Sequence, residues 1–453
     1  MAHFAIVCPE DAGHLLSIGS VGIELVRRGH RVTIIGRAQA APVVEQLNLP
    51  LHVLKLDDVP WPSAVLTWLA FSLVGAGWKI GLRNAFCWRA RAILEKLPAV
   101  LRDLDVDGVI ADQIVSAAGT AAARAGVPFV TVCSALLWNE EIGVPPPFTG
   151  WPYAQGRTAR WRNYCGYAGW RWYMRPVLAV INRYRTRWRL APFARISDTY
   201  SPLAQISQLC AEFDFPRYEL PSVFHYVGSL AANRQANIDD GFPWERLDGR
   251  PLVFASLGTI PEPVNVPVFR KIAEACAGVN AQLVLALGRW TEKHDSLREK
   301  LGTLPGNHLV VDFAPQLALL DKAALLITHA GVNTVLEAIT RGVPMVALPR
   351  NADQPGMGSR IEHAGIGLRA PFHRCTPEGL RRLIVRMLTD DRFRQRAKGL
   401  QQAMIAAGGA QRAADIAEEA LTTGRPVLRP CGSLGTGACV VRSKPQLPHE
   451  KVS

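Results

Sequence analysis

Short apolar runs alternate along the chain with longer segments in which apolar residues recur every three or four positions. The short runs are typical of buried strands and the longer segments of amphipathic helices. Strands separated by helices indicate βαβ units and a parallel sheet, whose binding sites lie at the carboxyl ends of the strands. The predicted strands are residues 3–9, 31–36, 106–113 and 127–133, and then 251–259, 281–288, 308–315, 324–331 and 343–349.

The predicted strands form two groups, and a turn-rich stretch with several prolines and glycines separates them. Such a composition is typical of an interdomain linker. We therefore expect an α/β protein with two Rossmann-like parallel-sheet domains. The expected parts are a first domain at 1–218, a linker at 219–250, a second domain at 251–408, a C-terminal helix at 409–425 that packs back toward the first domain, and a flexible tail at 426–453.

Composition supports a folded protein without a membrane-spanning helix. Hydrophobic residues make up 49% and charged residues 20% of the 453 positions, enough for two cores. The nine cysteines are scattered singly, as reduced thiols of the cytoplasm are. The N-terminus has no basic leader, and the uncharged run at 63–78 is shorter than the ~20 residues of a spanning helix. A cytoplasmic location follows.

The formal charge of +13 comes largely from one basic and aromatic segment, residues 142–197. It contains ten arginines, five tryptophans, five tyrosines and no acidic residue. This composition suits a membrane interface, where arginines meet lipid phosphates and rings lie at headgroup depth. It would also suit single-stranded nucleic acid, or a solvated helix face with buried aromatic side chains. The apolar run at 63–78 favours the membrane interpretation.

Two polar residues follow strands of the first group. His14 lies where a loop after the first strand enters a helix, and Asp112 ends a strand of the same predicted sheet. A neutral imidazole there could take a proton from an acceptor hydroxyl, and a carboxylate bonded to it would fix its tautomer. His14 could equally be a surface residue, and Asp112 the N-cap of the helix that follows it.

The stretch SLGT (256–259) follows the first strand of the second group. Gly258 allows close backbone approach, and Ser256 and Thr259 offer hydroxyls to a phosphate. Neither a P-loop nor a GxGxxG pattern is present. By itself the stretch is a weak indication of an anion site.

A stronger anion site is predicted in THAGVNTVLEAI (328–339). Gly331 marks a turn from strand to helix, so free backbone N–H groups would face an incoming anion. His329 and Asn333 can donate to that anion, and Glu337 lies one turn on and can accept from a ribose diol. A capped helix with a polar face would explain Asn333 but not His329 and Glu337 together.

The acidic stretch DLDVD (103–107) has the spacing of a DxD metal motif. It precedes a predicted strand instead of following one. We therefore interpret it as the acidic end of a helix and expect no metal site there.

Several stretches, in order, resemble the nucleotide-sugar-dependent family 1 glycosyltransferases. They are GHLLSIGSVGIELVRRGH, FAPQ (313–316), THAGVNTVLEAITRGVPM and NADQ (351–354). The pattern HxGxNTVLEAxxxGVPxxxxPxxxDQ is similar to the donor-binding signature of that family. DGVIADQ, SPLAQISQL, FDFPR, FASLGT and DQPGMGSRIEHAGIG most resemble its zeaxanthin glucosyltransferase branch, which glycosylates carotenoid hydroxyls. The resemblance covers the chain to about residue 425.

The resemblance implies a GT-B fold, with two facing Rossmann-like domains and the site in the cleft between them. It implies that His14 is the general base and Asp112 its partner. Phe313 would stack on the base of the nucleotide, where many relatives have a tryptophan, and Gln316 follows at the usual offset. Leu16 and Ser17 lie where relatives often have a proline after the GH, which we expect to reshape the acceptor side near His14.

The remaining implied contacts belong to the donor. The resemblance implies that His329, Asn333 and Thr334 bind the diphosphate, with help from Thr259. It implies that Glu337 binds the ribose hydroxyls. Asp353 and Gln354 would bind the sugar hydroxyls.

The implied activity is inverting, metal-independent transfer of glucose from UDP-glucose to a hydroxyl of a lipophilic acceptor. The acceptor expected from the resemblance is a hydroxylated carotenoid such as zeaxanthin. UDP-glucose is a co-substrate, and no cofactor or metal ion is expected. The expected partners are the UDP-sugar, the acceptor and an anionic membrane surface contacted through 142–197, with no nucleic acid, at the cytoplasmic face of the membrane.

Three alternatives remain open from the sequence. The acceptor could be a sterol, a polyketide or another lipid aglycone, because the donor signature would be the same. The chain could be another enzyme on the same fold, such as a nucleotide-sugar epimerase, or a membrane-surface binding protein without catalysis. The presence of both His14 and Asp112 disfavours the last two.

Overall fold

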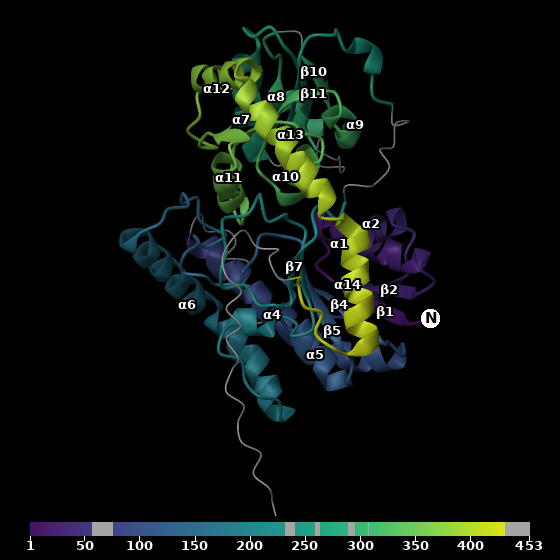
Figure 1. The fold of residues 1–453 in the computed structure, drawn as a ribbon. Coiled ribbons are helices and arrows are strands. Elements are labelled where there is room, and N and C mark those ends of the chain that lie inside the picture. The colour runs from purple at the N-terminus through teal and green to yellow at the C-terminus, as the bar shows by residue number, and fades with distance from the viewer. Residues whose placement is uncertain (57–75, 232–240, 259–262, 289–294, 307, 431–453) are drawn as a thin grey trace, which may run out of the picture.

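The protein has two domains, each built around a parallel sheet (Figure 1). This computed structural model describes residues 1–56, 76–231, 241–258, 263–288, 295–306 and 308–430. Thr259, most of the apolar run at 63–78 and most of the tail at 426–453 lie outside these ranges. The predicted α/β class with two Rossmann-like sheets is confirmed.

The first sheet has seven strands in the order β3-β2-β1-β4-β5-β6-β7, all paired in parallel. Its strands are β1 His3–Val7, β2 Arg31–Gly36, β3 Leu51–Val53, β4 Gly108–Asp112, β5 Phe129–Cys133, β6 Gln205–Ser207 and β7 Phe224–Tyr226. Its helices are α1 Ala12–Arg27, α2 Ala41–Gln46, α4 Ala76–Asp103, α5 Ala118–Ala125 and α6 Arg157–Arg187.

The second sheet has six strands in the order β10-β9-β8-β11-β12-β13, again parallel. The strands are β8 Leu252–Ser256, β9 Gln282–Ala286, β10 Leu309–Val311, β11 Ala323–Thr328, β12 Met345–Ala347 and β13 Gly367–Arg369. The helices are α7 Val266–Cys276, α8 Asp295–Leu301, α9 Gln316–Leu320, α10 Val332–Ile339, α11 Gln354–His363, α12 Pro377–Thr389 and α13 Asp391–Ala406. The last helix of the chain is α14 Gly409–Thr423.

Every strand predicted from an apolar run is present. The strands that the sequence pattern did not predict are β3, β6, β7 and β13, each three residues long and containing a polar residue or glycine, whereas the equally short β10 and β12 lie in apolar runs. Because β7 pairs with β6, the first sheet extends into residues 219–250, the range assigned to the linker. That linker therefore starts too early.

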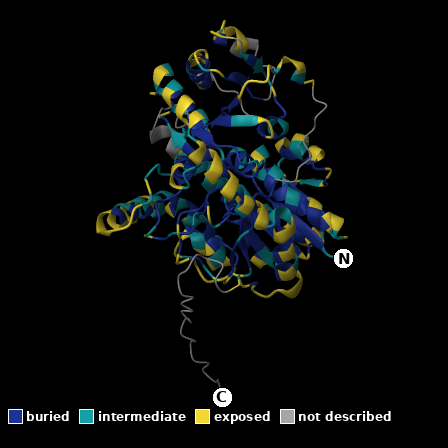
Figure 2. Ribbon diagram, turned by 45° about the horizontal axis from the view of Figure 1, so that its top comes forward, coloured by how far each residue is buried: buried dark blue, intermediate teal, exposed yellow. Residues whose placement is uncertain are grey.

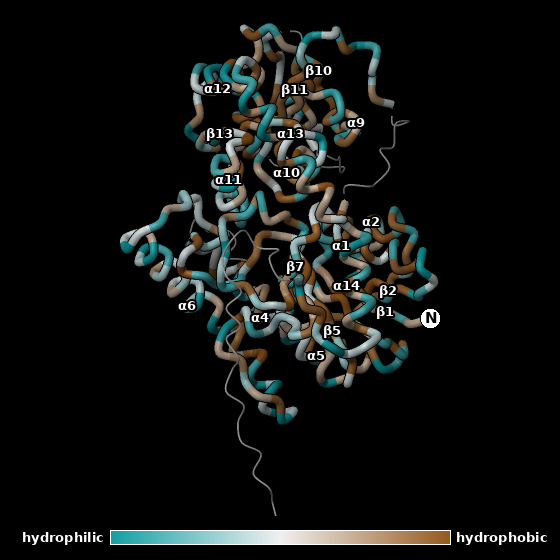
Figure 3. Tube along the Cα trace, in the orientation of Figure 1, coloured by the Kyte–Doolittle hydropathy of each residue, from teal (hydrophilic) through white to brown (hydrophobic). Residues whose placement is uncertain are grey.

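Both faces of each sheet are covered by helices, which explains why most strand residues are apolar (Figures 2 and 3). Phe4 and Ile6 of β1 pack with α1 and α14, whereas Ala5 and Val7 pack on the other face with α4, α5 and α6. In the second sheet, α7 and α12 cover one face and α10, α11 and α13 the other.

The C-terminal helix α14 belongs to the core of the first domain, although it follows the second domain in sequence (Figure 1). His30 Nε2 lies 3.1 Å from Glu418 Oε1, and Arg28 forms ion pairs with Asp415 and Glu418. These contacts tie α14 to the segment that follows α1. Within the described part of the chain, no helix is both long and apolar enough to cross a membrane.

The strand order reverses once in each sheet, between β1 and β4 in the first and between β8 and β11 in the second. Such a switch point leaves a crevice at the carboxyl ends of the two strands, where ligands of open parallel sheets bind. Residues that follow β1, β4, β8 and β11 are therefore placed by topology to form sites.

Candidate active site

His14 and Asp112 meet at the switch point of the first sheet. His14 lies in the first turn of α1, directly after β1, and Asp112 is the last residue of β4. His14 Nδ1 lies 2.7 Å from Asp112 Oδ2. A carboxylate can only accept, so Nδ1 carries the proton and Nε2 keeps its lone pair for a substrate.

The carboxylate of Asp112 is buried and held by several donors. The backbone N–H of Ile114 donates to Oδ1 at 2.8 Å, and the Ser134 hydroxyl donates to Oδ2. Ser134 Oγ also lies 2.7 Å from His14 Nδ1. Helix α5 begins only at Ala118, so Asp112 does not serve as its N-cap.

The electrostatics of this pair favour a charged imidazole more than free solution does. Burial by itself disfavours the imidazolium of His14, but the charge and hydrogen bond of Asp112, with smaller contributions from Asp11 and Asp353, outweigh it. The pKa of His14 is therefore raised above its ordinary value of 6.5. A raised pKa makes the ring a stronger base and stabilises the imidazolium that forms when it takes a proton.

At the second switch point, His329 follows β11 and packs against two glycines. A Cβ on Gly331 would lie 2.6 Å from His329 Nε2, and a Cβ on Gly258 would lie 3.4 Å from the same atom. The left-handed residue of this turn is Ala330, with φ of 65°, whereas Gly331 has an ordinary φ of −65°. Gly331 is thus needed for space beside the imidazole and not for the turn itself.

The imidazole of His329 is neutral near pH 7. Burial, and then the positive charge of Arg350, lower its pKa from 6.5 to about 4. A neutral ring at the start of α10 can offer an N–H to an anion but not a full positive charge. Any attraction for a phosphate here would come from the helix N-terminus and Arg350.

On α10, the predicted donor residues point in different directions. Gln316 Nε2 donates to Glu337 Oε2 and lies 3.5 Å from Thr334 Oγ1, so these three side chains form one polar group. Asn333 instead reaches across the cleft: its Nδ2 donates to the Gly13 carbonyl at 2.7 Å.

Asp353 and Gln354 lie at the start of α11, at the edge of the second domain that faces the first. Asp353 Oδ2 accepts from the backbone N–H of Leu136 at 3.2 Å. Burial raises the pKa of Asp353, partly offset by that bond and by the charge of His14. Gln354 Oε1 accepts from the backbone N–H groups of Arg350 and Asn351, which leaves its amide nitrogen as the group to offer a ligand.

Phe313 follows β10 and is 51% exposed, so its ring is accessible for stacking. Its strand, β10, lies on one side of the central strand β8, and β11, which carries His329 at its end, lies on the other side.

The acidic stretch 103–107, for which we expected no metal site, has a structural role. Asp103 ends α4, and Asp107 Oδ2 accepts from the His3 N–H at 2.7 Å. Among the residues described, no three His, Cys, Asp or Glu side chains gather closely enough to hold a metal ion.

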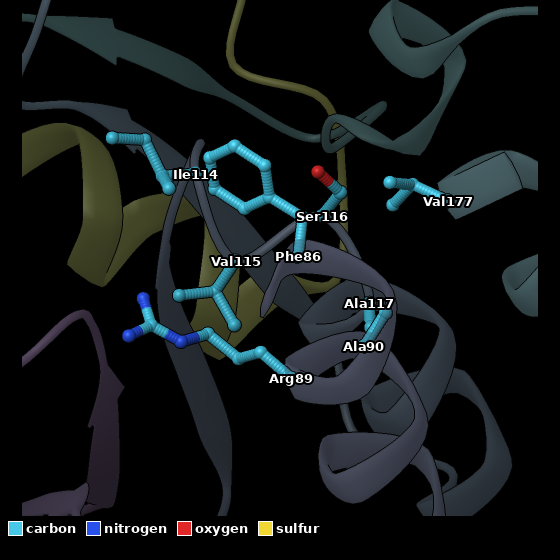
Figure 4. A pocket seen from close by; sticks show the side chains of 8 residues that line it. All are labelled: Phe86, Arg89, Ala90, Ile114, Val115, Ser116, Ala117 and Val177. Carbon is cyan, nitrogen blue, oxygen red and sulfur yellow. The ribbon is translucent and has the colours of Figure 1, made fainter. Parts of the chain in front are cut away.

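A small pocket opens beside the loop that follows Asp112 (Figure 4). It lies between α4, this loop and α6, and its apolar lining includes Phe86, Ile114, Val115 and Val177. Its basic residue is Arg89, whose guanidinium donates to Glu10 at 2.9 Å.

Sequence reasoning missed several polar residues of this site. Ser134 and Gln208 directly follow β5 and β6, as Asp112 ends β4, so the rule that identified Asp112 would have found both. Ser17, which we expect to reshape the acceptor side, also contacts the donor side, because its Oγ lies 2.9 Å from Asn333 Oδ1.

Two facing parallel-sheet domains, with polar groups at both switch points, have the arrangement of the GT-B fold. A family model described as UDP-glucoronosyl and UDP-glucosyl transferase matches residues 194–403. A zeaxanthin glucosyltransferase of Pantoea ananas is 38% identical over 95% of this chain and 99% of its own. One of Pseudescherichia vulneris is 33% identical over 93% of this chain and 98% of its own. The chain belongs to the UDP-glucosyl transferase family and is a glycosyltransferase.

Solved structures agree on the fold. The glycosyltransferase of kitacinnamycin superposes with a TM-score of 0.72 at 24% identity, covering 92% of this chain and 98% of that one. CalG4, the calicheamicin glycosyltransferase, superposes with a TM-score of 0.68 at 22% identity, covering 94% and 100%. The expected GT-B architecture is thereby confirmed.

Proposed function

We propose that this enzyme transfers glucose from UDP-glucose to a hydroxyl of a hydroxylated carotenoid, with inversion at the anomeric carbon and without a metal ion. The observation that carries the proposal is the His14/Asp112 pair, which faces Asp353 of the donor domain across the cleft. This places a base of raised pKa opposite the residues to which the donor sugar is assigned.

The proposed reaction is a single displacement. His14 Nε2 takes the proton of the acceptor hydroxyl as its oxygen bonds to the anomeric carbon, and the bond from that carbon to the diphosphate oxygen breaks. The electron pair leaves with UDP, whose charge the start of α10 and the N–H of His329 stabilise. Attack opposite the leaving group converts an α-linked donor into a β-glycoside.

The carotenoid acceptor is supported by the relatives. Two relatives that match over nearly their full length are named zeaxanthin glucosyltransferases.

The test is to incubate the purified protein with UDP-glucose and zeaxanthin in lipid vesicles, and to analyse the products by chromatography and mass spectrometry. We expect a more polar product heavier by one hexose, with a β-linkage by NMR, and the same rate when EDTA is present. Transfer only to a sterol or polyketide aglycone would contradict the carotenoid proposal. An α-linked product would contradict the inverting mechanism.

We further propose that α6 rests on an anionic membrane surface, from which the acceptor is drawn. The helix runs along the outer edge of the first domain (Figure 1). Trp161 and Trp172, 71% and 70% exposed, lie on its outward face with the half-exposed Tyr164. Exposed arginines of the same helix are Arg157, Arg160, Arg175, Arg183 and Arg187.

Not all aromatic residues of this segment face outward, so the interpretation as buried aromatic side chains holds for some of them. Tyr167 is buried, and Trp170 packs edge-on against Trp138 with ring centroids 5.1 Å apart. The remaining exposed rings, spaced along one face and interleaved with arginines, have the composition of an interfacial helix.

Vesicle binding tests the membrane surface. An arginine near an anionic surface contributes about 1 kcal/mol, so Arg175→Gln with Arg183→Gln should weaken binding to phosphatidylglycerol-containing vesicles by about 20–30-fold, measured by sedimentation. Arg382→Gln with Arg394→Gln, equally exposed on α12 and α13, makes the same charge change and should have little effect. Equal losses in both double variants would attribute binding to net charge alone.

A further inference from the structure

Gln208 links the two domains from the carboxyl end of β6. Its side chain is fully buried, and its amide nitrogen donates to two groups. One is the backbone carbonyl of Ser134, and the other is Asn333 Oδ1, at 3.1 Å. Both protons of the amide nitrogen are thus used, one within the first domain and one across the cleft.

Asn333, at the start of α10, is bound by the first domain at both ends of its amide. Its Oδ1 faces Ser17 Oγ at 2.9 Å as well as Gln208, and its Nδ2 donates to the carbonyl of Gly13 at 2.7 Å. Gly13 immediately precedes His14 in the chain. One side chain of the donor domain therefore contacts both the backbone beside the base and the residue that holds Ser134.

The chain of hydrogen bonds continues from Ser134 to the proposed base. Gln208 fixes the backbone of Ser134, and the Ser134 hydroxyl donates to Asp112 Oδ2 and lies 2.7 Å from His14 Nδ1. Since Asp112 sets the tautomer and direction of the imidazole, any shift of Ser134 would turn the ring.

We propose that Gln208 is a positioning residue that couples Asn333 of the donor domain to the His14/Asp112 pair, so that the base is oriented once α10 docks against the first domain. This rests on the proposed function, in which the start of α10 lies at the diphosphate and His14 takes the acceptor proton. It assigns to Gln208 no contact with either substrate.

The bridge explains why a fully buried glutamine stands directly after a strand. Its buried Oε1 has no hydrogen-bond partner among the described residues, so the two bonds of its amide nitrogen are what hold the side chain in place. When the donor domain moves away, Asn333 Oδ1 leaves Gln208, and the hold of Gln208 on Ser134 loosens with it. Base orientation would then depend on domain closure, which favours proton removal only when the donor site is assembled.

The test is a double-mutant cycle of Gln208→Met and Asn333→Ala, which separates a shared network from independent effects. Methionine keeps the length of the side chain and removes its hydrogen bonds. We expect Gln208→Met to lower kcat about tenfold, and the double variant to be no slower than Asn333→Ala alone. If the fold losses in kcat of the two single variants multiply in the double variant, the two residues act independently and the proposal is overturned.

A second readout needs no substrate. The pH titration of the His14 ring, followed by NMR, should shift in Gln208→Met and in Asn333→Ala, and the two shifts should not add. The charged groups that face this ring are Asp112, Asp11 and Asp353, and none is changed in these variants. An unchanged titration in Gln208→Met would overturn the bridge even if the wild type proved inactive toward UDP-glucose.

Gln205→Met is the matched control. Gln205 is also a buried glutamine, three residues earlier on β6, and its amide bonds to Ser201 and Asn139, away from the cleft. We expect its loss to lower the melting temperature without moving the His14 titration or kcat. If Gln205→Met and Gln208→Met change the melting temperature, the His14 titration and kcat alike, Gln208 has only a structural role.

The failure of the proposed function can be told apart from the failure of this proposal. If the wild type transfers no glucose, the proposed function is contradicted, whereas the titration test of Gln208 still applies.

Discussion

His14→Ala should lower kcat for glycosyl transfer by about 10²–10⁴-fold, the usual contribution of a general base. The imidazole lies at the start of α1 with Nδ1 held 2.7 Å from Asp112, so Nε2 is the group that can accept a proton. Alanine removes that group and leaves the acceptor hydroxyl to ionise unaided. The binding of UDP should change little, because the donor residues lie in the other domain.

Initial rates at saturating UDP-glucose, with UDP affinity measured separately by calorimetry, check this expectation. His373→Ala is a suitable control, because His373 is exposed on the second domain. A rate near that of the wild type in His14→Ala, with His373→Ala also unchanged, would eliminate His14 as the base.

The pH profile gives an independent check on the same pair. Because the pKa of His14 is raised above 6.5, and the neutral ring is the active form, kcat/KM should rise with pH through a midpoint above 6.5. Asp112→Asn removes the charge that raises this pKa, so the midpoint should move to lower pH while the maximal rate falls. A midpoint that stays in place in Asp112→Asn would show that Asp112 does not act on His14.

Arg360→Met should destabilise the protein by about 1.5–3 kcal/mol, the usual contribution of a buried hydrogen bond to a charged group. Arg360 lies in the middle of α11, and its Nε donates at 2.7 Å to Asp214 Oδ1, in the loop between β6 and β7. Asp214 also accepts from Arg217 Nε at 2.8 Å and from the Tyr226 hydroxyl. Arg360, Asp214 and Arg217 are all buried.

The functional consequence concerns the donor sugar. Helix α11 begins at Gln354, one residue after Asp353, so the ion pair of Arg360 and Asp214 fixes the direction of the helix that carries both. Two stretches that carry the family resemblance, FDFPR and DQPGMGSRIEHAGIG, meet at this ion pair. We therefore expect Arg360→Met to raise the KM for UDP-glucose as well.

Denaturant unfolding followed by circular dichroism measures the loss of stability. The control is Arg392→Met, which removes the exposed pair of Arg392 and Asp390 by the same substitution and should have little effect. If Arg360→Met is as stable as Arg392→Met, the buried pair contributes no net stability and the position of α11 depends on other packing.

The sequence itself determined the architecture, because strands buried on both faces must be continuously apolar and the helices between them must be amphipathic. It also placed His14 and Asp112 at the same edge of one sheet, since the carboxyl ends of parallel strands share an edge. The short strands β3, β6, β7 and β13 escaped prediction, because each contains a polar residue or glycine and no continuous apolar run marks it.

Only the tertiary structure decided which polar residues meet across the cleft. Asn333 was predicted to bind the diphosphate, yet its amide is shared with Gly13, Ser17 and Gln208 of the first domain. Asp214 and Arg360, 146 positions apart, likewise carry no sequence pattern that pairs them. The periodicity of apolar residues along the sequence indicates which face of a helix or strand a residue occupies, but not which residue of the other domain it meets. How two domains dock depends on the summed packing of α10, α11 and the loops after β5 and β6, and no local pattern in the chain encodes that sum.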